Sequence, residues 1–223
     1  MGLKSITATI YNNVVSGLPG LDINSRFVTE QVEDDVIRER YGLIKEYSIK
    51  NLMPKNDLVL SINCLPVDCE SLEKCCVEDP TMIRHIEIPQ IITDFGSDAV
   101  LFLGSVDRQI KFTVYTDYAW RNHKYRRRGA DKPFVWIDTS PNENNMCDAF
   151  IFNAPLLTVA SITAIFKDPR QLEGFACCPE DTAEEISNFS FIEKDIIQRV
   201  TEKYIRYYRQ MAQATTPNDQ MIK

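Results

Sequence analysis

The chain has 223 residues, of which 44% are hydrophobic, 10% aromatic and 26% charged. This composition is typical of a folded globular protein, because a disordered chain has too few apolar residues to form a core. The formal net charge of −7 excludes binding of nucleic acid over the whole surface, since phosphate binding needs clustered Lys and Arg. No run approaches the ~18 apolar residues that a membrane-spanning helix needs, so we expect no membrane contact.

The seven cysteines indicate reduced thiols rather than a disulfide framework. Their number is odd, and the sequence begins without the apolar run of a secretory signal. The two adjacent pairs suit neither a disulfide nor a zinc site, whose cysteine pairs are separated by a few residues. We therefore expect no metal and no other cofactor. The cysteines are Cys64, Cys69, Cys75, Cys76, Cys147, Cys177 and Cys178.

The first part of the chain, residues 1–53, predicts helices. Ile6–Val15 reads as a short helix that ends at the run Gly17-Leu-Pro-Gly20. Between Phe27 and Tyr41 the apolar positions recur every three or four residues with charged residues between them, which indicates an amphipathic helix. Ser25 is its expected N-cap and Gly42 its expected end.

The middle part, residues 54–170, predicts an antiparallel β core arranged as a sandwich or a barrel. Short runs rich in β-branched and aromatic residues alternate there with turn-forming residues. Residues 121–128 would form the loop of a long hairpin between the fourth and fifth strands. The expected strands are Leu58–Ile62, Ile83–Ile92, Ala99–Leu103, Ile110–Trp120, Pro133–Asp138, Ala149–Asn153 and Leu157–Phe166.

Residues 171–212 predict helices again, and residues 213–223 form a tail without periodicity. The last helix is expected to begin at the capping box Ser190-Phe-Ile-Glu193. Its apolar surface is so wide that it needs cover on more than one side, from the β core or from a neighbouring subunit. We expect a single α+β domain over 1–223. The apolar positions of the helix are Ile192, Ile196, Ile197, Val200, Tyr204, Ile205, Tyr207, Tyr208 and Met211.

A basic cluster is the densest chemical feature of the sequence, with five cations and a histidine in eight residues. Its members are Arg121, His123, Lys124, Arg126, Arg127 and Arg128. Arginine forks bind phosphates or carboxylates, and Trp120 and Tyr125 are available for stacking. A solvated loop tip with a few ion pairs is the alternative interpretation. The candidate contacts with a partner or with DNA are Arg121, Lys124, Arg126, Arg127 and Arg128.

A second candidate surface lies on the last helix. Tyrosine and arginine are enriched where subunits meet, and here they alternate within six residues. Packing of the tyrosines in the core of the chain itself is the alternative. The candidate interface residues are Tyr204, Arg206, Tyr207, Tyr208 and Arg209.

No motif indicates catalysis. Only His85 and His123 could activate a cysteine nucleophile, and neither lies in a recognisable motif, so we read both as surface histidines. Adjacent acids such as Asp34-Asp35 point in different directions on a helix. Gly104-Ser-Val-Asp107 is too short for a phosphate-binding loop. We therefore expect a protein that is not an enzyme.

Four stretches carry a resemblance to a known family: Gly104–Arg108, Tyr118–Arg128, Phe134–Asp138 and Ala164–Arg170. With the order of a helical start, a β middle and a tyrosine-rich final helix, the chain resembles head–tail connector proteins of crAss-like tailed bacteriophages over most of residues 85–210. The resemblance implies a virion subunit that is assembled in the host cytoplasm into a ring of about twelve copies below the portal. Its implied partners are the portal, other connector or tail proteins and the passing genome.

The charge pattern suits such a ring, because a head-to-tail interface joins two unlike faces of each subunit. Arg126, Arg127 and Arg128 would then face the DNA channel or pair with acids of a neighbouring subunit or ring. The alternative is a monomeric module that binds nucleic acid or an acidic partner through residues 121–128. A structural adaptor of another assembly, such as a baseplate or a secretion machine, is a third interpretation.

Overall fold

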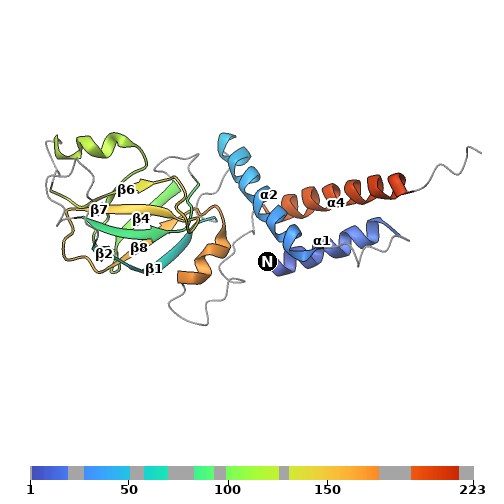
Figure 1. The fold of residues 1–223 in the computed structure, drawn as a ribbon, viewed down its shortest axis with the longest axis horizontal. Helices are drawn as coiled ribbons and strands as arrows, with labels where there is room; N and C mark the ends of the chain where they lie inside the picture. Colours follow the sequence, from blue (N-terminus) through green and yellow to red (C-terminus); the bar gives the residue numbers. More distant parts are fainter. Residues whose placement is uncertain are drawn as a thin grey trace, which may run out of the picture. The chain divides into compact units, whose positions relative to one another are not determined.

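The computed structural model describes residues 2–19, 28–50, 58–69, 83–92, 99–125, 131–175 and 192–215. The chain divides into two compact units (Figure 1). The helical unit comprises Met1–Asp57 and Ser187–Lys223, and the β unit comprises Leu58–Ile186. The two helical ends, which the sequence places on opposite flanks of the β part, thus belong to one unit. The predicted α+β class is confirmed.

The described helices of the helical unit are α1 (Leu3–Gly17), α2 (Thr29–Ile49) and α4 (Glu193–Thr215). The predicted first helix is confirmed. The predicted end of the second helix is wrong, because α2 continues through Gly42 and buries Leu43 and Ile44 completely. Burial of two such side chains outweighs the ~1 kcal/mol that a glycine costs inside a helix. The expected N-cap Ser25 is wrong, because α2 begins at Thr29 and Val28 occupies its N-cap position. The other expected cap, Ser190, lies outside the described residues.

Two sheets form the β unit. The smaller has the order β1-β8-β4 and the larger the order β2-β3-β7-β6-β5. The strands of the smaller sheet are β1 (Leu60–Pro66), β4 (Val100–Ser105) and β8 (Val159–Ala164). Those of the larger are β2 (Asp68–Cys69), β3 (Arg84–Ile88), β5 (Thr113–Tyr115), β6 (Phe134–Asp138) and β7 (Cys147–Phe152).

One hydrophobic core joins the two sheets, which makes the β unit a sandwich, one of the two arrangements that the sequence predicted. Ile62, Leu103 and Ile162 project into this core from the smaller sheet, and Ile86 and Ile151 from the larger one. Successive side chains of a strand point to opposite faces. Along β3 the exposed Glu87 therefore lies between the buried Ile86 and Ile88, whereas β7 buries side chains on both faces over residues 149–152. The outer face of the larger sheet is therefore a second surface with its own side chains.

The predicted long hairpin is wrong. Of its expected first strand, Ile110–Trp120, only the three residues of β5 form a strand, and the chain then forms the 3₁₀ helix η4 (Tyr118–Tyr125). The chain then returns as β6 parallel to β5, with Val114 opposite Val135. A tight hairpin turn can join only antiparallel strands, so a parallel pair requires a crossover. Most of the basic cluster therefore belongs to a crossover, of which η4 is the described part.

Another 3₁₀ helix, η5 (Pro169–Phe175), follows β8, and its Leu172 is buried in the sandwich core. Cys64 is exposed and Cys147 is buried, and both are free thiols. Burial raises the pKa of the Cys147 thiol. None of the helices within the described ranges is long and apolar enough to cross a membrane.

Candidate interaction surface on helix α4

Helix α4 separates the five predicted interface residues into two groups. Tyr204 and Tyr208 are 6% and 5% exposed, in line with Ile196 and Val200 on the side that packs against α1 and α2. For these two tyrosines the structure favours the alternative of core packing. Tyr207 is 52% exposed, and Arg206 and Arg209 are exposed on either side of it in the sequence.

The buried side of α4 is tied to α2 through a carboxylate. Tyr204 Oη donates a hydrogen bond of 3.0 Å to Asp35 Oδ2, and Lys203 Nζ lies 2.7 Å from Asp35 Oδ1. A carboxylate that is 7% exposed would be costly without such partners. Burial and the bond to Asp35 raise the pKa of Tyr204. This pair of contacts fixes how α4 lies on α2.

Further along the two helices, Glu46 forms a second link. Its carboxylate accepts hydrogen bonds from Lys50 Nζ at 2.6 Å and from Arg199 Nη2 at 2.7 Å. Both partners stabilise the charged form and lower the pKa of Glu46 to about 2. Tyr47 Oη donates to Asp195, which raises the pKa of Tyr47. Asp195 and Arg199, early in α4, contact residues late in α2, whereas Tyr204 contacts Asp35, early in α2. The two helices therefore run antiparallel.

Arg199 and Lys203 form ion pairs with acids of α2, whereas the later cations of α4 do not. Within the described residues, Arg206 and Arg209 have no ion pair or hydrogen bond with another side chain. Together with Tyr207 they define an exposed surface that we call the α4 patch (Arg206, Tyr207 and Arg209). Unpaired arginines beside an exposed tyrosine have the composition of interface hot spots.

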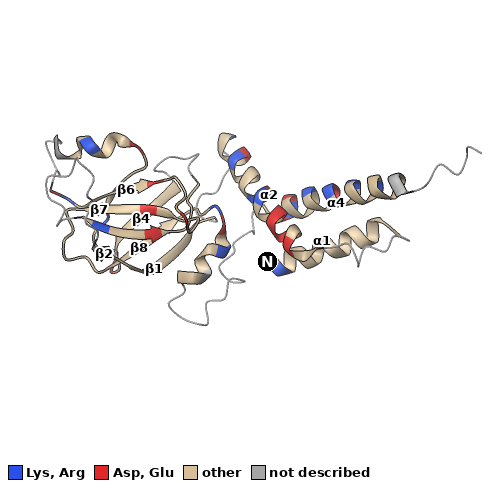
Figure 2. Cartoon of the chain, in the orientation of Figure 1, with Lys and Arg blue, Asp and Glu red and all other residues tan. Residues whose placement is uncertain are grey.

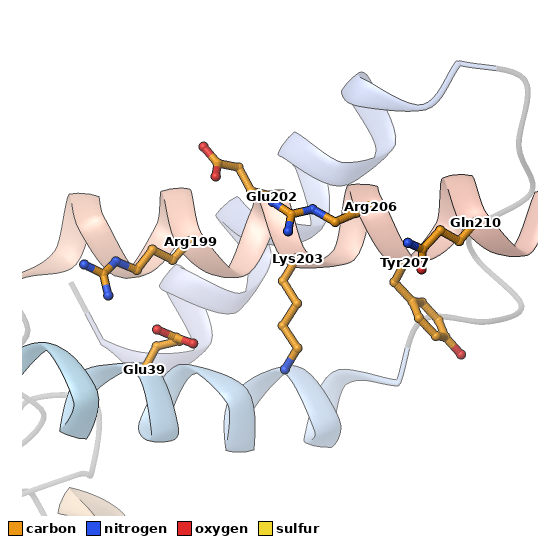
Figure 3. A pocket seen from close by; sticks show the side chains of 7 residues that line it. All are labelled: Glu39, Arg199, Glu202, Lys203, Arg206, Tyr207 and Gln210. Carbon is orange, nitrogen blue, oxygen red and sulfur yellow. The ribbon is translucent and has the colours of Figure 1, made fainter.

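A groove of about 460 Å³ runs between α2 and α4 beside this patch (Figure 3). Lys203 reaches from α4 toward α2, and Glu39 points back from α2 (Figure 3). The lining carries two carboxylates and three cations, so it matches no purely anionic ligand. The lining residues are Glu39, Arg199, Glu202, Lys203, Arg206, Tyr207 and Gln210.

The basic cluster lies only partly within the described residues. Arg121 is exposed, and its guanidinium lies 5.0 Å from the ring centre of Tyr118 and 5.8 Å from that of Trp120. These cation–π contacts hold the side chain along η4. The side chain of Lys124 and the whole of residues 126–128 lie outside the described part, so the predicted contact of these cations stays a prediction.

The reading of His123 as a surface histidine is wrong. Its side chain is 2% exposed, its ring stacks on Phe134 at 4.1 Å, and its Nδ1 shares a 2.9 Å hydrogen bond with Tyr115 Oη. Trp120 adds to this contact by stacking on Trp136 and Phe152, at 5.4 and 5.2 Å. Helix η4 is thus held against the outer face of the larger sheet by aromatic rings.

Sequence reasoning missed this aromatic layer, although a signal for it exists. Phe134 and Trp136, like Phe150 and Phe152, are two residues apart, so each pair points to one face of its strand. The register places Phe134 opposite Phe152 and Trp136 opposite Phe150. The alternation could have been found, but the pairing of the two strands could not.

A row of acids crosses the same sheet, with Glu87 on β3, Asp148 on β7 and Asp138 on β6 at facing positions (Figure 2). Like charges at facing positions destabilise a sheet unless they are compensated. His85 Nε2 lies 3.0 Å from Asp148 Oδ1, and Asn142 Nδ2 donates to Glu87 at 3.0 Å and to Asp148 at 3.1 Å. No group of three or more metal-binding side chains is placed to hold an ion within the described ranges, so the row reads as a structural network.

No protein-family model matches the chain, and a search of curated proteins finds no significant match.

Proposed function

We propose that the chain is a structural subunit of a ring in the head-to-tail connector between the portal and the tail of a tailed phage. The observation that carries this proposal is the α4 patch. The apolar side of α4 is covered by the helical unit itself, yet Arg206, Tyr207 and Arg209 remain exposed. An exposed surface of this composition supports contact with another protein subunit.

The distribution of charge over the helices supports the same proposal. Helix α1 contains Lys4 as its only charged residue. Helix α2 has more acids than cations, most of them in its first turns, whereas α4 has more cations than acids, with Arg206 and Arg209 in its second half (Figure 2). A subunit of a ring meets its two neighbours through different faces, because rotation closes the ring without matching a face to itself. Helices of unlike charge provide such faces.

The proposed function includes no catalysis and no cofactor. Both histidines have structural partners, His85 in Asp148 and His123 in Tyr115. The buried carboxylate of Asp35 is engaged by Tyr204 and Lys203. These groups hold elements together, which agrees with a protein whose role is to assemble.

The proposal is tested by the mass of the purified full chain in solution, measured by light scattering with and without the portal ring of its phage. Negative-stain images of any large species follow. A ring of about twelve copies supports the proposal. A chain that stays monomeric in both conditions contradicts it. A monomer that retards DNA at ~150 mM salt, and loses this affinity as salt rises, would support the module built on residues 121–128 instead.

A further inference from the structure

The first turns of α2 present a surface opposite in charge to the α4 patch. Residues 29–35 hold four acids and no Lys or Arg. Asp35 turns inward to Lys203 and Tyr204. Glu30 is exposed and Glu33 half-buried, and neither has a hydrogen bond or ion pair with the residues that the structure describes. We call Glu30 and Glu33 the α2 patch.

Both patches lie at the same end of the helical unit, because α2 and α4 are antiparallel. Residues 203–215 of α4 hold three cations and no acid, and only Lys203 has an acidic partner on α2. The arginines of the α4 patch therefore do not use the acids of the α2 patch within one chain. Opposite charges that stay apart in one molecule can pair between two molecules.

We propose that the α4 patch of one copy binds the α2 patch of the next copy. Arg206 and Arg209 place their guanidinium groups on the carboxylates of Glu30 and Glu33, a geometry that arginine favours over lysine because its fork binds both carboxylate oxygens. Tyr207 supplies the apolar contact area between them. The interface joins two different faces, so repeated copies close by rotation. This inference rests on the proposed ring.

A second copy suits the α4 patch better than a nucleic acid does. Glu39 and Glu202 line the groove beside Arg206, and the α2 patch adds two further acids at the same end of the unit. A phosphate backbone brings a continuous row of negative charges past these four carboxylates. A protein surface that presents only two carboxylates meets the arginines with less of that repulsion.

Two charge-reversed variants of the full chain test the contact. The first, Arg206→Glu/Arg209→Glu, makes both patches acidic, and the second, Glu30→Lys/Glu33→Lys, makes both basic. Each variant alone is expected to stay monomeric by light scattering at low salt. An equimolar mixture is expected to assemble, because each reversed patch then meets an opposite partner on the other variant.

The matched control is Lys132→Glu/Lys194→Glu, which changes the net charge as the first variant does but at exposed lysines outside both patches. It is expected to assemble like the wild type. Circular dichroism checks that each variant keeps its helices. Assembly of wild type that neither reversal weakens, or a mixture that stays monomeric, overturns the contact and leaves the ring in place. A wild-type chain that never assembles overturns the contact and the proposed function together.

Discussion

Tyr204 is buried on the apolar side of α4 and also forms a hydrogen bond with α2. The four-residue spacing Ile196, Val200, Tyr204 and Tyr208 predicts an apolar side of the helix. The spacing does not indicate which tyrosine hydroxyl forms a hydrogen bond, because the acceptor, Asp35, lies 169 positions away in the sequence. The sequence therefore does not distinguish the buried Tyr204 and Tyr208 from the exposed Tyr207, whereas the packing of α4 on α2 does.

Tyr204→Phe is expected to lower the free energy of unfolding by about 1–2 kcal/mol, because it removes a hydrogen bond to a buried carboxylate. Chemical denaturation followed by circular dichroism measures this loss. Tyr207→Phe is the matched control, and its exposed hydroxyl predicts a change within about 0.5 kcal/mol. Equal effects of the two substitutions would contradict the assigned role of Asp35.

Glu46 predicts a specific dependence of stability on pH. Its pKa falls from an ordinary 4.5 to about 2 in the folded chain, so its salt links contribute stability above pH 4.5 and lose it as the pH falls toward 2. The difference in stability between wild type and Glu46→Gln is expected to be constant above pH 5.5 and to shrink below pH 4.5, within ~1 unit of these values. A difference that grows on acidification would contradict the link.

At the scale of elements, periodicity predicted the helices well and the strand connections poorly. Helix α1 and the sandwich follow from spacing and alternation. The hairpin failed because nothing in the segments 110–120 and 133–138 shows whether their strands pair parallel or antiparallel. The parallel pairing occurs together with tertiary contacts of η4 that the local sequence does not indicate, such as the stacking of Trp120 on Phe152 of β7. The acid row Glu87, Asp148 and Asp138 likewise depends on register.

The aromatic contact of η4 is expected to stabilise the β unit. Trp120→Ala should reduce its free energy of unfolding by about 3 kcal/mol, since it removes a large ring stacked on two others. Tyr118→Ala removes an aromatic ring that is 70% exposed and should change stability by less than about 1 kcal/mol. Thermal melting of both variants, followed by near-ultraviolet circular dichroism, compares them. Equal losses would show that η4 is not anchored through Trp120.

Substitution of glycine by alanine is expected to have opposite effects on stability at two positions, Gly42 and Gly104. Gly42 lies inside α2, and nothing stands within 4 Å of a Cβ added there, so Gly42→Ala should stabilise the chain by about 0.5–1 kcal/mol. A Cβ at Gly104 would lie 2.0 Å from the Ile110 carbonyl oxygen, so Gly104→Ala should destabilise it. Denaturation midpoints test both signs. A loss of stability in Gly42→Ala would contradict the continuous helix.

For the whole molecule, the sequence indicated two candidate surfaces, residues 121–128 and the tyrosines and arginines of the last helix, but not which cations of that helix stay unpaired. The contacts that the structure describes single out Arg206 and Arg209. The difference arises because Arg199 and Lys203, on the same helix, find acids on α2. Which cations remain available depends on that packing and not on the local density of charge.

The most direct test of the ring is the mass of the assembled species, measured by native mass spectrometry of the full chain at several concentrations. A closed ring predicts one dominant mass of about twelve chains that does not change with concentration once assembly is complete. A monomer at every concentration would contradict the ring, and a ladder of masses that grows with concentration would show open association instead.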